Sequence, residues 1–243
     1  MRLTAHLASI FCVALVAPAV PAVAQNGPDI FVTPIANAPF TAVINVQRTV
    51  VQPNGAVVNL RSMREIARDS QGKIHNEART LMPVTQSGTP AVLRVHIYDP
   101  QSRVVTYFYP PQQTFWIGAG NRPPATEPPD SYAAPAGEAL PPSQYVMEND
   151  LGEREIEGLP VHGVRKTQKV SAENSAVGKA ITITDEYWYS EDLRMNLLVK
   201  HSDPRTGSAT LTVAKIVRTE PDQSFFQVPN GYRPGPMRQI TMR

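Results

Sequence analysis

The sequence predicts a mainly β protein, an antiparallel meander that forms a curved sheet or an open half-barrel and contains few short helices. Three observations predict this fold. Apolar and polar residues alternate with period two in many short segments. Asn, Asp, Gly and Pro separate these segments at positions typical of tight turns. After residue 24, no apolar stripe with helical spacing extends beyond about three turns.

The first 24 residues have the composition of a secretory signal peptide. Arg2 supplies the basic start, residues 7–16 form a short apolar run, and Ala22-Val23-Ala24 is a small-residue cleavage site. The run is shorter than the ~20 residues that a spanning helix needs. Cys12, the one cysteine of the chain, lies in this segment, so the mature chain has no disulfide. We therefore expect an exported protein, periplasmic or secreted, with no transmembrane segment.

The mature chain is close to electrically neutral. Leaving out Arg2, it has 22 Lys and Arg residues against 21 Asp and Glu residues. This balance gives no charge signal for nucleic-acid binding. Residues 233–243 form a basic tail with three arginines and no acidic residue. The tail is either a solvated terminus or a weak contact for an anionic lipid or cell-wall polymer.

Residues 25–39 lack periodicity and are rich in Pro, Asn and Gly, so we expect an N-terminal arm. A first β-meander is predicted for residues 40–117. Its first strand, residues 40–51, turns at Pro53-Asn54-Gly55 into a second strand whose Arg61, Arg64 and Arg68 are expected to be exposed. Further strands are expected at residues 73–81, 91–99, 103–109 and 114–117. Within residues 91–99, alternation places Arg94, His96 and Tyr98 on one face.

Residues 118–145 interrupt the pattern with seven prolines. Proline lacks a backbone N–H donor, so this segment is predicted to form neither a strand ladder nor a long helix. Three interpretations remain open: a linker between two meanders, a flap over a cavity, or a polyproline ligand for a partner.

A second β-meander is predicted for residues 146–232, in one domain with the first. Its central hairpin turns at Asp203-Pro204-Arg205-Thr206-Gly207. Placing Ser202 opposite Ser208 sets Val199 opposite Leu211 and puts apolar residues opposite one another. A preceding strand at residues 180–189 should pair with this hairpin. Beyond it, aromatic residues near residues 225–232 are expected to fold back onto the sheet.

The densest aromatic cluster is Asp185-Glu186-Tyr187-Trp188-Tyr189. One interpretation is a core tryptophan with tyrosines at a sheet edge; the other is an aromatic surface that binds a ligand. The second interpretation gives a set of candidate ligand-binding residues: Trp188, Tyr187, Tyr189, His201, Leu197 and Val199.

The sequence contains no recognisable catalytic, metal or cofactor motif. His75, His96, His162 and His201 lack metal-ligand spacing. His201-Ser202-Asp203 is not a catalytic triad, because adjacent residues of a strand point to opposite faces. We therefore predict no catalytic, metal or cofactor-binding residues, and no enzyme.

Three blocks resemble a group of exported bacterial proteins of unknown function that is common in acidobacteria. They are GEREIEGLPVHGVR, DEYWYSEDLRMNLLVKHSDPRTG and EPDQSFFQVPNGY, from residue 152 onward. The meander and its ending are more distantly similar to the lipoprotein-carrier superfamily of LolA, LolB and RseB. That resemblance implies an antiparallel sheet curled around an apolar cavity, and it brings no catalytic residues.

These observations predict an exported periplasmic protein that binds or carries an apolar ligand, such as a lipid or acyl chain. Burial of alkyl surface, at ~25 cal/mol per Å², would supply the affinity. The alternative is a non-enzymatic envelope module that interacts with a protein partner and has no small ligand.

Overall fold

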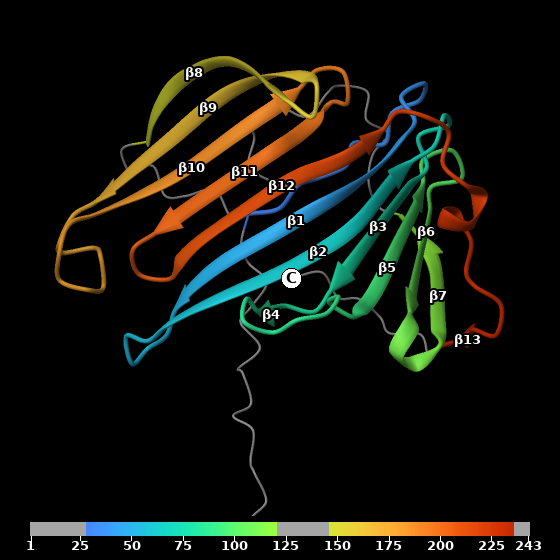
Figure 1. Cartoon of the computed structure of the whole chain (residues 1–243), viewed down its shortest axis with the longest axis horizontal. Helices are drawn as coiled ribbons and strands as arrows, with labels where there is room; N and C mark the ends of the chain where they lie inside the picture. The colour runs from blue at the N-terminus through green and yellow to red at the C-terminus, as the bar shows by residue number, and fades with distance from the viewer. Residues whose placement is uncertain (1–27, 121–145, 236–243) are drawn as a thin grey trace, which may run out of the picture.

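The computed structural model describes residues 28–120 and 146–235, which form one large, mostly antiparallel sheet (Figure 1). The strand order is β13-β7-β6-β5-β3-β2-β1-β12-β11-β10-β9-β8, with β4 paired to β2 outside this path. The order ends at β13 and β8, so the sheet is not closed. This confirms the predicted fold class. The signal peptide, the 121–145 part of the Pro-rich segment and most of the basic tail lie outside the described residues.

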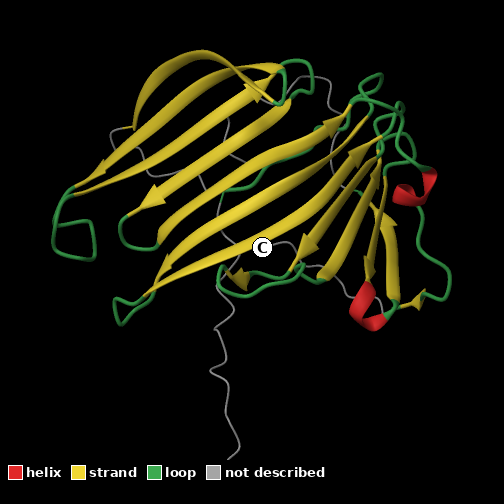
Figure 2. Ribbon diagram, viewed as in Figure 1, coloured by secondary structure: helices red, strands yellow, loops and turns green. Residues whose placement is uncertain are grey.

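The strands follow the alternating segments of the sequence closely. Their bounds are β1 Phe40–Val51, β2 Val57–Arg68, β3 Ile74–Arg79, β4 Met82–Pro83, β5 Val92–Asp99, β6 Val104–Tyr109, β7 Thr114–Ala119, β8 Val146–Ile156, β9 Leu159–Val170, β10 Ile181–Ser190, β11 Met195–Asp203, β12 Gly207–Val217 and β13 Arg233–Pro234. Two short 3-10 helices, η1 Pro110–Gln112 and η2 Gln223–Phe226, are the helices of the described part (Figure 2).

The two meanders meet where β1 pairs antiparallel with β12. On the other side of β12, the central hairpin has the predicted register, with Ser202 opposite Ser208 and Val199 opposite Leu211. The strand before it, β10, pairs with β11 as expected. Alternation and turn chemistry were sufficient to predict this hairpin, because a slip of one residue would exchange its two faces.

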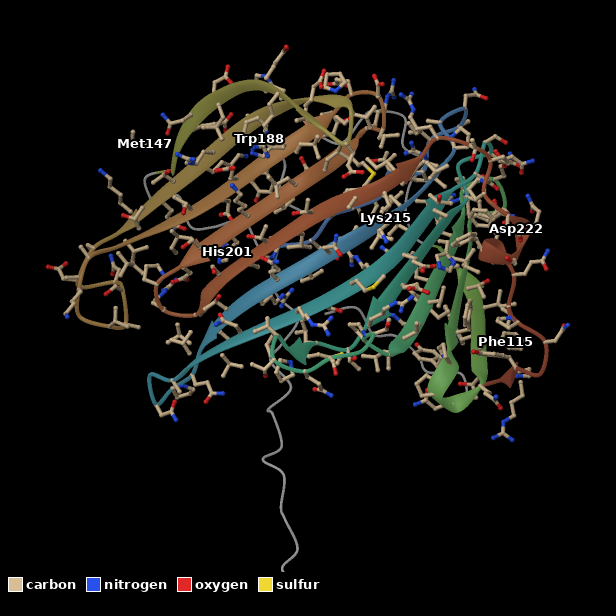
Figure 3. All side chains as sticks on the ribbon, viewed as in Figure 1. Phe115, Met147, Trp188, His201, Lys215 and Asp222 are labelled. Atoms are coloured by element: carbon tan, nitrogen blue, oxygen red, sulfur yellow. The ribbon has the colours of Figure 1, made fainter. Side chains whose placement is uncertain are left out.

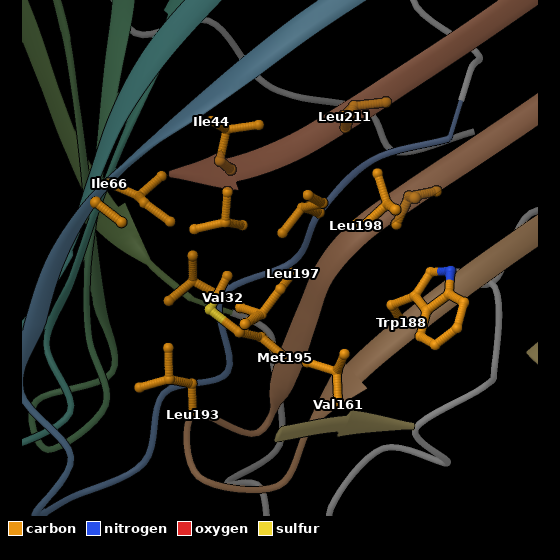
Figure 4. Packing of buried hydrophobic residues seen from close by; sticks show 14 of the residues in the cluster. Val32, Ile44, Ile66, Val161, Trp188, Leu193, Met195, Leu197, Leu198 and Leu211 are labelled. Carbon is orange, nitrogen blue, oxygen red and sulfur yellow. The ribbon is translucent and has the colours of Figure 1, made fainter. Parts of the chain in front are cut away.

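We call inner the sheet face that bears Ile44 and Ile66, and outer the opposite face. The segment before β1 packs on the inner face, where Ile30 and Val32 are buried in the main core (Figure 4). Besides these four residues, the cluster includes Phe40, Met195, Leu197, Val199, Leu211 and Val213. The predicted N-terminal arm therefore contributes apolar side chains to the core.

A smaller cluster lies on the outer face of β5 and β6. Val95, Ile97 and Phe108 are buried there, against Phe226 and Tyr232 of the segment that follows β12. The rings of Phe108 and Tyr232 meet edge to face, with centroids 5.5 Å apart. The C-terminal aromatic residues thus fold back on the sheet as expected. The segment before β1 and the segment after β12 therefore cover opposite faces.

Arg68 corrects one sequence expectation, because its side chain is fully buried rather than exposed. Its Nε donates to the Ala38 carbonyl (2.8 Å), and its Nη1 donates to the carbonyls of Thr33 (2.8 Å) and Leu193 (3.0 Å). The guanidinium also lies over the Phe40 ring. Arg68 shares the inner face with Ile66, so the alternation of β2 itself directs it into the core.

Replacing Arg68 with Met should lower the free energy of unfolding by about 3 kcal/mol, because buried carbonyl groups lose their donor. Urea unfolding monitored by circular dichroism measures this change. Arg61→Met is the matched control on the same strand; Arg61 lies on the outer face and binds the Gln86 and Gly88 carbonyls at an exposed site. We expect less than about 1 kcal/mol there. Equal losses in the two variants would contradict the central role of Arg68.

Candidate ligand-binding face

Five of the six candidate residues from the sequence are buried in the sheet. Trp188 is 7% exposed, and the other four, Tyr187, Tyr189, Leu197 and Val199, are buried at least as deeply. His201 is the one member of the set with a partly exposed side chain (Figure 3). The structure therefore uses most of this cluster for packing and does not bring the six together in one open site.

Trp188 lies against the backbone of Gly163, its neighbour on β9. A Cβ atom at Gly163 would approach the indole ring to 2.7 Å, so only glycine leaves room for the ring. On the ring, the Arg154 guanidinium carbon stands 3.7 Å from the ring centroid. Trp188 Nε1 donates to Glu186 Oε1 at 2.8 Å. The tryptophan is thus held on several sides by the chain itself.

Glu186 is the centre of a charged cluster on the outer face. Arg165 and Lys200 each donate to its carboxylate at 3.0 Å, in addition to Trp188. Burial acts to raise the pKa of Glu186, but these three hydrogen bonds outweigh it and lower the pKa to about 2. The carboxylate is consequently ionised at neutral pH and fully engaged.

His201 pairs with Asp185 on the opposite, inner face, where Nδ1 and Oδ1 are 2.7 Å apart. The hydrogen bond with Asp185 raises the pKa of His201 above its ordinary value, although burial opposes this. Ser202, the next residue, pairs with Thr184 and Ser208 and faces the other way. The pair therefore has no neighbouring hydroxyl on β11 to activate.

An open aromatic feature lies elsewhere, on the inner face of β5, β6 and β7. His96, Tyr107 and Trp116 are direct cross-strand neighbours, and we call them the aromatic row. The centroids of His96 and Tyr107 are 4.9 Å apart and those of Tyr107 and Trp116 are 5.9 Å apart, both in stacked arrangement. All three are partly exposed.

Gly118 explains how Trp116 can lie flat along its own strand. A Cβ atom at Gly118 would come within 2.1 Å of the indole ring, so the ring occupies the space that a side chain would take. Gly118 therefore makes room for the Trp116 ring.

A pocket of about 150 Å³ lies beside the aromatic row on the inner face. Four arginines line it, and three of them lie on the inner face of three strands: Arg48 of β1, Arg64 of β2 and Arg94 of β5. We call it the arginine pocket. Arg94 connects the two features, because its guanidinium carbon is 5.2 Å from the Tyr107 ring centroid.

Sequence reasoning missed both features. For the row, the signal was present: the predicted strands and turns of residues 91–117 fix which side chains are neighbours across strands. For the pocket the local signal was incomplete, because its lining adds Leu211 of β12 and Pro28 and Asp29 of the N-terminal segment to side chains of β1, β2 and β5.

In the two described ranges, no three His, Cys, Asp or Glu side chains are grouped so that they could hold a metal ion. Nor does the described chain contain a helix with the length and hydrophobicity required to span a membrane.

No family model and no curated protein matches this chain. Solved structures do match. MucB is 10% identical with a TM-score of 0.37, and the match covers 81% of this chain but 59% of MucB. LprF from Mycobacterium bovis is 10% identical with a TM-score of 0.32, over 81% of this chain and 90% of LprF. A LolA superfamily protein from Nitrosomonas europaea is 9% identical with a TM-score of 0.31, over 79% and 91%.

The Glu186 cluster predicts an acid-dependent stability. The pKa of Glu186 is lower in the folded state than in the unfolded state. The contribution of its ionised carboxylate to the free energy of unfolding is therefore fully present above the unfolded-state pKa near 4.5 and is lost as pH falls toward about 2. Glu186→Gln should therefore be destabilised at pH 7, by up to about 3 kcal/mol. The difference in free energy of unfolding between the variant and the parent protein should narrow between pH 5 and pH 2. Denaturant unfolding across this range measures the difference, and a difference independent of pH would contradict the prediction.

Proposed function

We propose that the protein is an exported, non-enzymatic binding or carrier protein, whose inner face holds the apolar part of a lipid-like ligand. The observation that supports this best is the aromatic row. Three stacked rings remain partly exposed on one face, although aromatic side chains normally bury about 150–250 Å² each. Covering a further ~100 Å² of this surface would contribute about 2.5 kcal/mol to binding.

The place of the ligand follows from what fills the rest of the inner face. Over β1, β2 and β12, the chain's own Ile30 and Val32 pack against Ile44, Ile66 and Leu211. An acyl chain would have to displace these side chains. On β5 to β7 the aromatic row is the accessible apolar surface, so the proposed contact is there.

A second candidate is an envelope interaction module. Its support is β8, an 11-residue strand at one end of the sheet order, on which Met147 is 52% exposed. A terminal strand leaves backbone donors and acceptors that an extended partner segment could pair with. The acidic residues along β8 argue for the first candidate, because charged side chains are a common protection of sheet edges.

A bromine-labelled fatty acid tests the proposed function, because bromine quenches indole emission on contact. The chain has two tryptophans, and only Trp116 lies in the aromatic row. Quenching by the fatty acid should disappear in Trp116→Phe and persist in Trp188→Phe. Gly118→Val places a side chain in the space that the Trp116 ring occupies, so it should weaken fatty-acid binding about tenfold. Absence of quenching, or quenching through Trp188 alone, would refute binding at this face.

A further inference from the structure

We propose that the ligand is an anionic amphiphile, whose oxyanion group is held by Arg48, Arg64 and Arg94 in the arginine pocket. The inference rests on the proposed function for the apolar part of the ligand. It adds the chemical class of the polar part and the residues that select it.

The three arginines point to the same region because they share the inner face. Arg64 is opposite Ile44 on β1, Arg48 is opposite Ala209 on β12, and Arg94 is opposite Ala78 on β3. Val46 and Leu211 add apolar lining. At ~30 Å³ for each water molecule, the pocket has the volume of roughly five waters, enough for a carboxylate, a sulfate or a phosphate group.

The pocket carries an excess of positive charge. Arg64 binds the Asp29 carboxylate and the Ile30 carbonyl, so one cation is neutralised. A fourth lining arginine, Arg79, is paired with Glu77 and Glu65. Neither Arg48 nor Arg94 forms an ion pair with any residue of the described ranges. Asp29 is the one carboxylate that lines the pocket, so two of its three inner-face arginines have no ion-pair partner in the described part.

Two hydrogen-bond donors are also unsatisfied. The Nε atoms of Arg48 and Arg64 are buried and have no hydrogen-bond partner in the described structure. Buried N–H groups without partners are unfavourable, and guanidinium groups match the geometry of carboxylates and phosphates closely. An oxyanion in the pocket would supply the missing charge, and a rotation of the two guanidinium groups toward it would give their Nε atoms acceptors.

Arg94 sets the direction in which the rest of the ligand would extend. It lies over Tyr107, the middle ring of the aromatic row. An anion bound at Arg94 therefore places an attached alkyl chain beside Tyr107, at the middle of the row. From there the chain would run across β6 toward Trp116 on β7, at ~4.8 Å per strand. Head group and tail thus have adjoining sites on one face.

Asp29 acts in this arrangement as an internal competitor. Its carboxylate already occupies one arginine of the pocket and is 54% exposed. Removing its charge should free Arg64 for the ligand. Removing the charge of Asp29 and removing the charge of a pocket arginine should therefore change the affinity for the anion in opposite directions. A general loss of folding would lower the affinity in both cases.

The test measures binding of dodecanoate, dodecyl phosphate, dodecanol and inorganic phosphate to the full mature chain by titration calorimetry. We expect an oxyanion probe to bind at least tenfold more tightly than dodecanol, and added salt to reduce that difference. Arg48→Gln and Arg94→Gln should each weaken anion binding about tenfold, whereas Asp29→Asn should strengthen it. Arg218→Gln is the control for charge, since Arg218 is exposed and paired with Asp192. Preference between dodecanoate and dodecyl phosphate identifies the oxyanion class.

Equal binding of dodecanol and the anions, unaffected by Arg48→Gln and Arg94→Gln, would overturn this inference and leave the proposed function standing. Binding of inorganic phosphate that depends on Arg48, without binding of any dodecyl probe, would support an anion site and overturn the proposed function. No binding of any probe would overturn both. Thermal unfolding of each variant verifies that the fold is retained.

Discussion

The burial of one cation, Arg68, determines how the chain's separate parts meet. Burial lowers its pKa to about 10, so the guanidinium is still charged at neutral pH and needs acceptors. Those acceptors are carbonyls of the N-terminal segment and of the β10–β11 turn. A buried charge whose hydrogen bonds go to backbone carbonyls fixes backbone positions, and here it fixes the segment that fills the inner face.

This fixed segment divides the inner face into two regions. Over β1, β2 and β12, Ile30 and Val32 complete a packed core. Next to it, the segment begins near the arginine pocket, where Pro28 and Asp29 form part of the wall. Beyond lie β5 to β7, with the aromatic row. By holding the N-terminal segment, Arg68 therefore stabilises the core and also fixes where the packed part of the inner face ends and the accessible part begins.

The sequence was sufficient for the sheet and for the central hairpin, because alternation and turn residues are local signals. It failed for Arg68, since a charged residue in an alternating strand was interpreted as exposed, although its position on the strand faces inward. For Trp188 the sequence left two interpretations open, a core residue and a ligand-binding surface residue. The close approach of Gly163 on the next strand shows why the ring is enclosed. The pocket combines side chains of β1, β2 and β5 with Asp29 of the N-terminal segment and Leu211 of β12, and no local pattern predicts these distant contributions.

The contacts of the N-terminal segment also affect the order of folding. Thr33 Oγ1 donates to the Arg194 carbonyl across 161 positions of sequence, and Arg68 reaches Leu193 across 125. Contacts between such distant positions form slowly, because a long loop has to close first. The local hairpins can form during synthesis, whereas the N-terminal segment can dock only after residue 194 has been made. A newly synthesised molecule therefore passes through an interval in which β1 to β7 can already pair and their inner face still lacks this cover.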